Sequence, residues 1–169
     1  MSAETIVFRE IREGDLDLLQ QHRNDPGTRT WLEDDREVSA AQQLHWFRNG
    51  GSANLRIAMA ADAAVGLARL SHDAATHVSM VGLDIFKPFR GRGLAKPVFR
   101  HTCEKAIAAG ARCLTLWVFG DNLPAVRVYR AEGFVLDANE ASKWLIRQFP
   151  HEHAPVPHIY VKMIRPVET

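Results

Sequence analysis

The chain has 169 residues, of which 46% are hydrophobic and 24% charged, and its formal net charge is +1. This length suits one domain with a sizeable core, and the near-zero charge argues against a general affinity for nucleic acids or anionic membranes. The two cysteines are too few for a disulfide framework, and no apolar run reaches the 18 residues of a transmembrane helix. The first residues, MSAETIVFREIREGD, lack a signal-peptide pattern. We therefore expect a cytoplasmic protein with a single domain, residues 1–169.

The first third of the chain predicts a strand, two helices and a turn between them. Alternating apolar and polar residues indicate the strand, and apolar residues three and four apart indicate the helices. Ser39 and Gln42 have the spacing of a capping box at the start of the second helix. The predicted ranges are 5–11 for the strand, 13–25 and 39–51 for the helices, and 25–28 for the turn.

The remaining two thirds mix strands with helices. Pro97 falls in the first turn of a predicted helix, where proline is tolerated. This order of elements indicates an α/β or α+β domain with a mixed sheet. The predicted strands are 55–60, 64–72, 77–86, 113–119, 143–149 and 158–164, and the predicted helices are 93–111 and 122–134.

The segment RGRGLA (90–95) lies where a predicted strand passes into a predicted helix, and it has the properties of an anion site. The first N–H groups of a helix have no partner within it, and the helix dipole adds partial positive charge. Gly91 and Gly93 remove the side chains that would keep a ligand from the backbone. We therefore expect a phosphate or diphosphate here. The nearby basic residues are Lys87, Arg90, Arg92, Lys96 and Arg100.

The segment RGRGLA also partly resembles other motifs. A Walker A loop requires Gly-Lys-Ser/Thr, whereas Pro97 follows Lys96, and a Rossmann fingerprint requires a glycine where Lys96 stands. RGRG could enter a DNA minor groove, but such hooks usually belong to disordered basic segments. A solvated turn whose charges only aid solubility is a further alternative.

A second motif follows in WVFGDNLPAVRVYRAEGF (117–134). Asn122, Ala125 and Tyr129 are separated by three and four residues, so they share one face of the predicted helix. The two motifs together strengthen each other, because their separation along the chain is itself specific.

With these two motifs, the chain resembles the GCN5-related N-acetyltransferases, the GNAT family, over about residues 77–134. Arg90, Gly93 and Ala95 match the family's acetyl-CoA motif, Q/R-x-x-G-x-G/A. Asn122 and Tyr129 match the residues of the family's next helix.

The resemblance implies a mixed, mostly antiparallel sheet that is splayed at the cofactor site, with helices on both faces. It also implies acetyl-CoA as cosubstrate, with its diphosphate on the backbone amides of about Arg92–Ala95 and its pantetheine arm along the strand near Leu83–Phe86. The residues expected to bind it are Leu83, Ile85, Phe86, Arg90, Gly91, Arg92, Gly93, Leu94, Ala95, Asn122 and Ala125.

The implied chemistry is direct acetyl transfer to a primary amine, with Tyr129 as the proton donor to the leaving sulfur. Tyr129 could instead be a core tyrosine bonded to the backbone, and Asn122 could be only a helix cap. The glutamates that serve as general base in relatives are replaced by Ser79 and Trp117. Asp84 is the first alternative base, followed by His77 and His72, and a water chain or an amine that binds already neutral would also suffice.

The segment 23–47 is similar to the N-terminal half of a GNAT subgroup that includes ribosomal-protein N-terminal acetyltransferases and an amino-sugar-nucleotide N-acetyltransferase of the pseudaminic acid type. Trp31, His45 and Trp46 are the expected acceptor-binding residues, with roles in the core or on a helix surface as the alternative. The acceptor would be a small molecule, an amino-sugar nucleotide or a protein N-terminus.

We expect a monomer or homodimer that binds no metal, nucleic acid or membrane. The only histidine-rich segment, with His151, His153 and His158, has no cysteine or carboxylate cluster to support a metal site. A non-catalytic CoA-binding module remains an alternative to an enzyme, because the usual base positions are vacant.

Overall fold

The computed structural model describes residues 5–149 and 152–168. Within these ranges the strands form one eight-stranded sheet in the order β1-β2-β3-β4-β5-β8-β6, with β7 also paired to β8. Only β4 and β5 run parallel, and every other pair is antiparallel. The strands are β1 (Ile6–Arg9), β2 (Leu55–Ala60), β3 (Ala63–Asp73), β4 (Val78–Ile85), β5 (Cys113–Phe119), β6 (Val135–Leu136), β7 (Lys143–Arg147) and β8 (Val156–Pro166).

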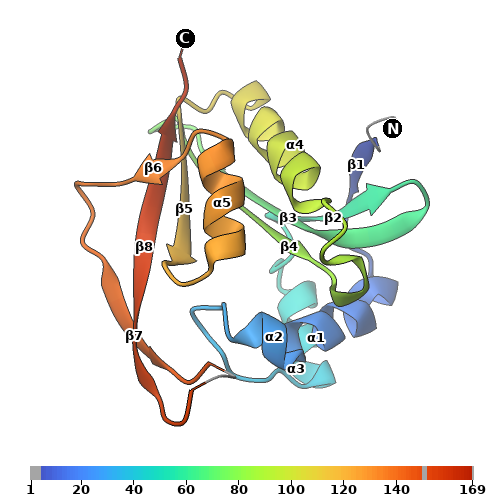
Figure 1. Cartoon of the computed structure of the whole chain (residues 1–169). Coiled ribbons are helices and arrows are strands. Elements are labelled where there is room, and N and C mark those ends of the chain that lie inside the picture. Colours follow the sequence, from blue (N-terminus) through green and yellow to red (C-terminus); the bar gives the residue numbers. More distant parts are fainter. Residues whose placement is uncertain (1–4, 150–151, 169) are drawn as a thin grey trace.

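Helices cover both faces of this sheet, which confirms the predicted fold class. In Figure 1, α1, α2 and α3 gather together, well apart from α4 and α5. The bounds are α1 (Leu16–Asn24), α2 (Pro26–Arg29), α3 (Ala40–Arg48), α4 (Ala95–Ala108) and α5 (Leu123–Ala131), with short 3-10 helices η1 (Glu13–Asp15) and η2 (Lys87–Phe89).

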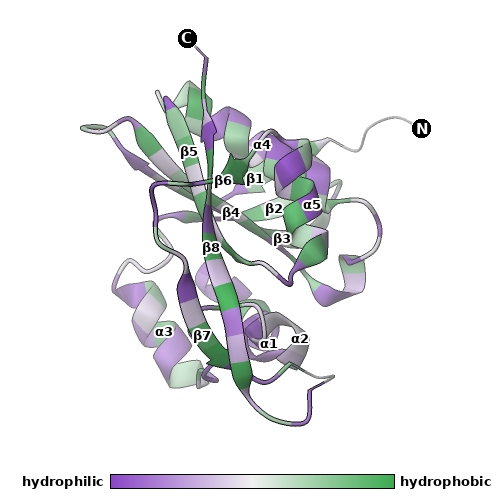
Figure 2. Ribbon diagram, turned by 60° about the vertical axis from the view of Figure 1, so that its left-hand side comes forward, coloured by the Kyte–Doolittle hydropathy of each residue, from purple (hydrophilic) through white to green (hydrophobic). Residues whose placement is uncertain are grey.

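The core is divided between the two faces. On one side, Leu16 and Leu19 of α1 pack with Ile57 and Leu67 of the sheet. On the other, α4 and α5 bury their apolar faces against β4, β5 and β8, and Cys103 is part of this cluster. Hydrophobic and hydrophilic segments alternate along β8 (Figure 2), as expected for a strand with two different faces. Burial raises the pKa of the Cys103 thiol to about 12, so it is an inert core residue.

The parallel pair β4 and β5 stays together over a short distance only. Val78, Ser79 and Met80 pair with Cys113, Leu114 and Thr115, and no pairing follows beyond these residues. The rest of β4, Val81–Ile85, therefore has no strand on its β5 side. β5 continues instead along β8, to which it is paired over its whole length. The predicted separation of the two strands is confirmed.

Of two predictions made from short sequence patterns, the capping box at the start of α3 is present and the turn at 25–28 is not. Ser39 accepts a hydrogen bond from the Gln42 N–H, and the Gln42 side chain accepts one from the Ser39 N–H, so the predicted capping box is confirmed. The prediction of a turn at 25–28 is wrong, because Pro26 occupies the first position of a helical turn, where its missing N–H has no cost. The two-residue strand β6 was not predicted.

Among the described residues, no helix combines the length and the hydrophobicity that crossing a bilayer requires. The two cysteines are unpaired thiols.

Gly66 of β3 lies against β4 so closely that no side chain fits between them. A Cβ at this position would lie 2.2 Å from the Asp84 carbonyl oxygen. We expect Gly66→Ala to lower the free energy of unfolding by about 1–3 kcal/mol, because the backbone of β4 must move. Chemical denaturation measures this, with Gly14→Ala as control, since nothing lies within 4 Å of its Cβ. Equal losses in the two variants would contradict the close approach.

Candidate active site

The turn between η2 and α4 exposes a row of backbone amides. Gly91 and Gly93 have φ angles of +74° and +77°, a conformation that side chains other than glycine rarely adopt. A Cβ at either position would meet no protein atom within 4 Å, so the space in front of the turn is open. Within the described chain, the N–H groups of residues 91–95 donate to no backbone or side-chain acceptor. A row of free amides at the start of a helix can bind an anion, and residues 91–95 are called the cradle below.

The side chain of Arg90 holds this turn from behind. Its guanidinium donates to the Ile85 carbonyl at 3.0 Å and to the Thr28 hydroxyl at 2.7 Å, and it lies 3.4 Å from the Asp25 carboxylate. Lys87 donates to the same carboxylate at 2.9 Å and, more than Arg90, lowers the pKa of Asp25. Arg90 is thus directed toward α1 and α2, and its role at the cradle is to fix the backbone.

The unpaired part of β4 leads directly to this turn. Leu83 and Ile85 pack toward α4, where they contact a core cluster. Phe86 follows the strand, but its N–H donates to the Val65 carbonyl and its ring is buried against His22, with ring centres 5.0 Å apart. A ligand along this edge can therefore bond to the backbone of β4 but not to the N–H of Phe86.

Asn122 and Tyr129 belong to the segment that follows β5, the strand that separates from β4. The Asn122 side-chain oxygen accepts a hydrogen bond from the Ala125 N–H at 3.3 Å, so Asn122 caps α5. The Tyr129 ring is buried against Phe99, with ring centres 4.8 Å apart. Its hydroxyl has no hydrogen-bond partner among the described residues, unlike that of an ordinary core tyrosine. Burial, and secondarily the charge of Asp84, raises the pKa of Tyr129, which keeps the proton on its oxygen at neutral pH.

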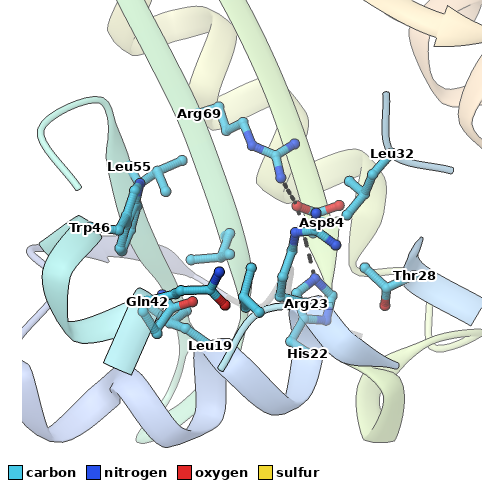
Figure 3. A pocket seen from close by; sticks show the side chains of 13 residues that line it. Leu19, His22, Arg23, Thr28, Leu32, Gln42, Trp46, Leu55, Arg69 and Asp84 are labelled. Carbon is cyan, nitrogen blue, oxygen red and sulfur yellow. Dashed lines mark hydrogen bonds and ion pairs between the residues drawn. The ribbon is translucent and has the colours of Figure 1, made fainter. Parts of the chain in front are cut away.

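A cavity of about 240 Å³ lies on the other side of β4, between the strands and the helices α1 and α3 (Figure 3). Asp84 of β4 points into it and forms an ion pair with Arg69 of β3. The His22 ring of α1 lies 3.9 Å from the same carboxylate. Most of the lining is apolar. The remaining lining residues are Leu19, Arg23, Thr28, Leu32, Val38, Gln42, Gln43, Trp46, Leu55 and Leu67.

Asp84 is ionised in this setting. Burial alone would raise the pKa of its carboxyl group, but the charge of Arg69, with help from His22, lowers it. An ionised carboxylate with a low pKa holds a cation well and accepts a proton weakly. The geometry thus places Asp84 on the wall of the cavity, and its electrostatics limit its strength as a base.

The residues expected on the acceptor side are only partly brought together. Trp46 lines the cavity. Trp31 packs instead against Phe149, with ring centres 4.6 Å apart, in a separate aromatic cluster. His45 is exposed on α3 and bonds to Asn49, away from the cavity. Sequence reasoning missed Arg69, because a single arginine in an alternating strand gives no signal until its neighbours across the sheet are known.

Two of the three alternative bases lie near the start of β4. Ser79 and His72 are hydrogen-bonded to each other at 2.8 Å at the far end of the β3–β4 pair. His77 precedes β4, eight residues from Ile85, which is roughly 26 Å of extended chain. Neither histidine lines the cavity that contains Asp84, and a role of either one as the base stays a prediction. Trp117 stacks on Tyr160, with ring centres 5.4 Å apart.

A family model for the acetyltransferase (GNAT) family matches residues 16–134. The chain belongs to this family. The match includes the cradle, the separated strands and the helix with Asn122 and Tyr129, and it makes the chain an acetyltransferase.

Solved structures with the same fold agree with the GNAT assignment. A spermidine N-acetyltransferase from Vibrio cholerae, in complex with CoA and spermine, has a TM-score of 0.79 at 17% identity, over 97% of this chain and 96% of that one. A ribosomal-protein-alanine N-acetyltransferase from Brucella melitensis has a TM-score of 0.72 at 17% identity, over 95% and 99%. A GNAT acetyltransferase from Bacillus anthracis has a TM-score of 0.75 at 12% identity, over 98% and 97%. No curated protein sequence matches the chain.

No group of three or more potential metal ligands occurs in the described part of this GNAT chain. His151 of the histidine-rich segment lies outside the described residues. His158 of that segment has a different role: its ring is buried between the carboxylates of Asp121, at 2.6 Å, and Glu152, at 2.9 Å. Asp121 directly precedes Asn122, so this histidine anchors the start of α5 to β8.

This anchor predicts a pH-dependent stability. Burial opposes the charge on His158, but Asp121 and Glu152 outweigh it, and the pKa of His158 in the folded protein is raised above its ordinary value of 6.5. The stabilisation is then complete below pH 6.5 and is lost as the pH rises through the folded pKa. The loss in unfolding free energy caused by His158→Gln should therefore be larger at pH 5.5 than at pH 9. Denaturation at both pH values tests this, with His45→Gln as control. A loss independent of pH would contradict the charged anchor.

Proposed function

We propose that this chain is an acetyl-CoA-dependent N-acetyltransferase that transfers the acetyl group directly to a primary amine. The observation that carries the proposal is the open row of unpaired amides at residues 91–95, next to a strand edge without a partner. The two phosphates of the CoA diphosphate match such amides, and the amide-rich pantetheine arm matches the free edge of β4. We infer that residues 1–169 form a single N-acetyltransferase domain.

The proposed cofactor contacts follow from this placement. Gly91, Arg92, Gly93, Leu94 and Ala95 would hold the diphosphate through their N–H groups. Leu83 and Ile85 would bond the pantetheine arm through their backbone. Phe86, whose N–H donates to Val65 and whose carbonyl accepts from the Phe89 N–H, would support the end of this strand edge. Arg90 would act by fixing the turn, and Asn122 and Ala125 by placing the start of α5 beside the arm.

Acetyl-CoA supplies the acetyl group as a thioester that an amine can attack. Backbone N–H groups on the free edge of β4 can stabilise negative charge on the carbonyl oxygen. Tyr129 donates its proton to the departing sulfur, a task that its unpartnered hydroxyl and raised pKa favour. Asp84 faces the acceptor side and can receive the amine proton, although Arg69 makes it a weak base.

The acceptor proposed on this basis is the amine of a small molecule, an amino-sugar nucleotide or a protein N-terminus. Similarity of the segment 23–47 to the ribosomal-protein and amino-sugar subgroup supports this range. The fold likeness to a ribosomal-protein-alanine N-acetyltransferase from Brucella melitensis is consistent with it. Trp46 would contact the acceptor, since it lines the cavity.

The cradle can be tested with two glycines that share one backbone conformation. Gly93 has φ +77° and Gly50, at the end of α3, has φ +78°, and neither Cβ would meet a protein atom within 4 Å. Gly93→Val and Gly50→Val should each lose about 1–2 kcal/mol of stability from the left-handed conformation. Only Gly93→Val should weaken acetyl-CoA binding, by about tenfold or more, because its side chain fills the cradle. Calorimetric titration measures this, and equal affinities in the two variants would remove the basis of the proposal.

The acid role of Tyr129 predicts a loss of turnover without a loss of binding. Tyr129→Phe should lower kcat by about 10²–10⁴-fold while acetyl-CoA affinity and melting temperature stay close to those of the parent. Thiol release with a panel of amines provides the measurement. Tyr160→Phe, the same change at a neighbouring buried tyrosine, is the control and should keep its turnover. Parental kcat in Tyr129→Phe would show that another group protonates the sulfur.

A further inference from the structure

The cavity beside Asp84 contains more positive than negative charge. Its lining includes two guanidinium groups, those of Arg23 and Arg69, and one carboxylate, that of Asp84. Arg69 and Asp84 neutralise each other in their ion pair. Arg23 has no carboxylate within 4 Å among the described residues. One half-buried guanidinium group, whose Nη1 atom is fully buried, is therefore left without a carboxylate in contact.

The acidic loop that follows α2 acts on Arg23 only from a distance: the charges of Asp34 and Asp35 raise its pKa, but neither carboxylate contacts it. Arg23 donates to the backbone carbonyl of Asp34 at 2.6 Å, not to its carboxylate. The Asp34 carboxylate is bonded to Arg36, and that of Asp35 lies 3.5 Å from Arg147. Both carboxylates are about half exposed to solvent. The loop thus uses its acidic side chains elsewhere.

Polar atoms without partners also line the cavity. The Arg23 Nη1 and the His22 Nε2 are buried and make no hydrogen bond in the described chain. The His22 side chain is only 6% exposed, and the Gln43 amide, in a residue 9% exposed, has no partner either. Buried donors without partners are costly, and a ligand with acceptor atoms would relieve that cost. Burial is the main cause that lowers the pKa of Arg23; Arg29 and Arg69 add to it, and the charges of Asp34 and Asp35 oppose it only in part.

The apolar part of the lining sets the shape of the rest of the ligand. Leu19, Leu55, Leu67, Val38 and Trp46 come from α1, the sheet, the loop before α3, and α3 itself. They leave about 240 Å³, enough for a molecule of amino acid size. In Figure 3, Arg69 and Asp84 extend from the strands while Arg23 and His22 extend from the opposite helix.

We propose that the acceptor is a small zwitterion, a primary amine with a carboxylate or phosphonate group next to it and an apolar side chain. Arg23 would bind the anionic group with the Gln43 amide, Asp84 would face the amine on β4, and the aliphatic residues would contact the side chain. This inference rests on the proposed acetyltransferase function. It separates the chain from acetyltransferases that act on polyamines, because Arg23, which contacts no carboxylate in the described chain, would repel the several positive charges of a polyamine.

Four amines that share the leucine side chain, together with spermidine, test the proposal. The probes are L-leucine, its phosphonate analogue, L-leucinamide, 3-methylbutylamine and spermidine, each with acetyl-CoA and scored by thiol release and by calorimetric titration into CoA-loaded protein. L-leucine or its phosphonate should exceed L-leucinamide and 3-methylbutylamine, which lack the anionic group, by about 10- to 100-fold in kcat/KM or affinity, since a charged hydrogen bond is lost in them. The comparison of L-leucine with its phosphonate analogue shows which of the two anionic groups the cavity prefers. A preference for leucinamide, which mimics a peptide N-terminus, or for spermidine or 3-methylbutylamine would overturn the proposal, and so would binding of none of the five probes.

Substitution of Arg23 supplies the matched test. Arg23→Gln should reduce the preference for the anionic probe over 3-methylbutylamine by about tenfold or more, and Arg23→Lys should restore part of it. Arg36→Gln, an exposed arginine of the neighbouring loop, should leave the preference unchanged. An unchanged preference in Arg23→Gln would overturn the proposal. Acetyl-CoA binding is measured in the parent and in each variant. A parent that does not bind acetyl-CoA would refute the proposed function. A parent that binds acetyl-CoA but lacks the expected acceptor preference would refute only this inference.

Discussion

The separation of β4 from β5 is the constraint on which the rest of the site depends. A strand in the middle of a sheet normally uses both of its edges, and a buried backbone group without a partner is unfavourable. β4 pairs with β3 over its whole length but with β5 only from Val78 to Met80. The free edge that remains ends at a turn whose amides are also unpaired. An extended ligand with a diphosphate at one end can satisfy both at once.

The same strand separates the two substrates, because its alternate residues face opposite sides. Val81 and Leu83 belong to the core beneath α4 and α5, on the side of Tyr129. Asp84 faces the cavity beneath α1 and α3. The donor and the acceptor can therefore approach one strand edge from different directions. Gly82 contributes to this arrangement, since the Arg69 side chain lies over it and reaches Asp84.

The predictions that succeeded rest on neighbours within a few residues. The capping box at Ser39, the cap at Asn122 and the glycine turn are each determined by short-range backbone chemistry, and the structure has the first two as expected. The fold class followed from the order of the elements. The sequence could not predict that Arg90 would reach Thr28, 62 residues away, or that Arg69 would pair with Asp84. Such contacts depend on which strands become neighbours. His72 and His77 lie at the start of β4, at the end of the strand remote from the glycine turn.

Hydrogen exchange of backbone amides with and without CoA tests the central claim most directly. The account predicts slower exchange at the amides of Gly91–Ala95 and along Val81–Ile85 when CoA is present, because the ligand supplies the acceptors that the chain lacks there. Protection confined to other segments, with these two unchanged, would contradict it.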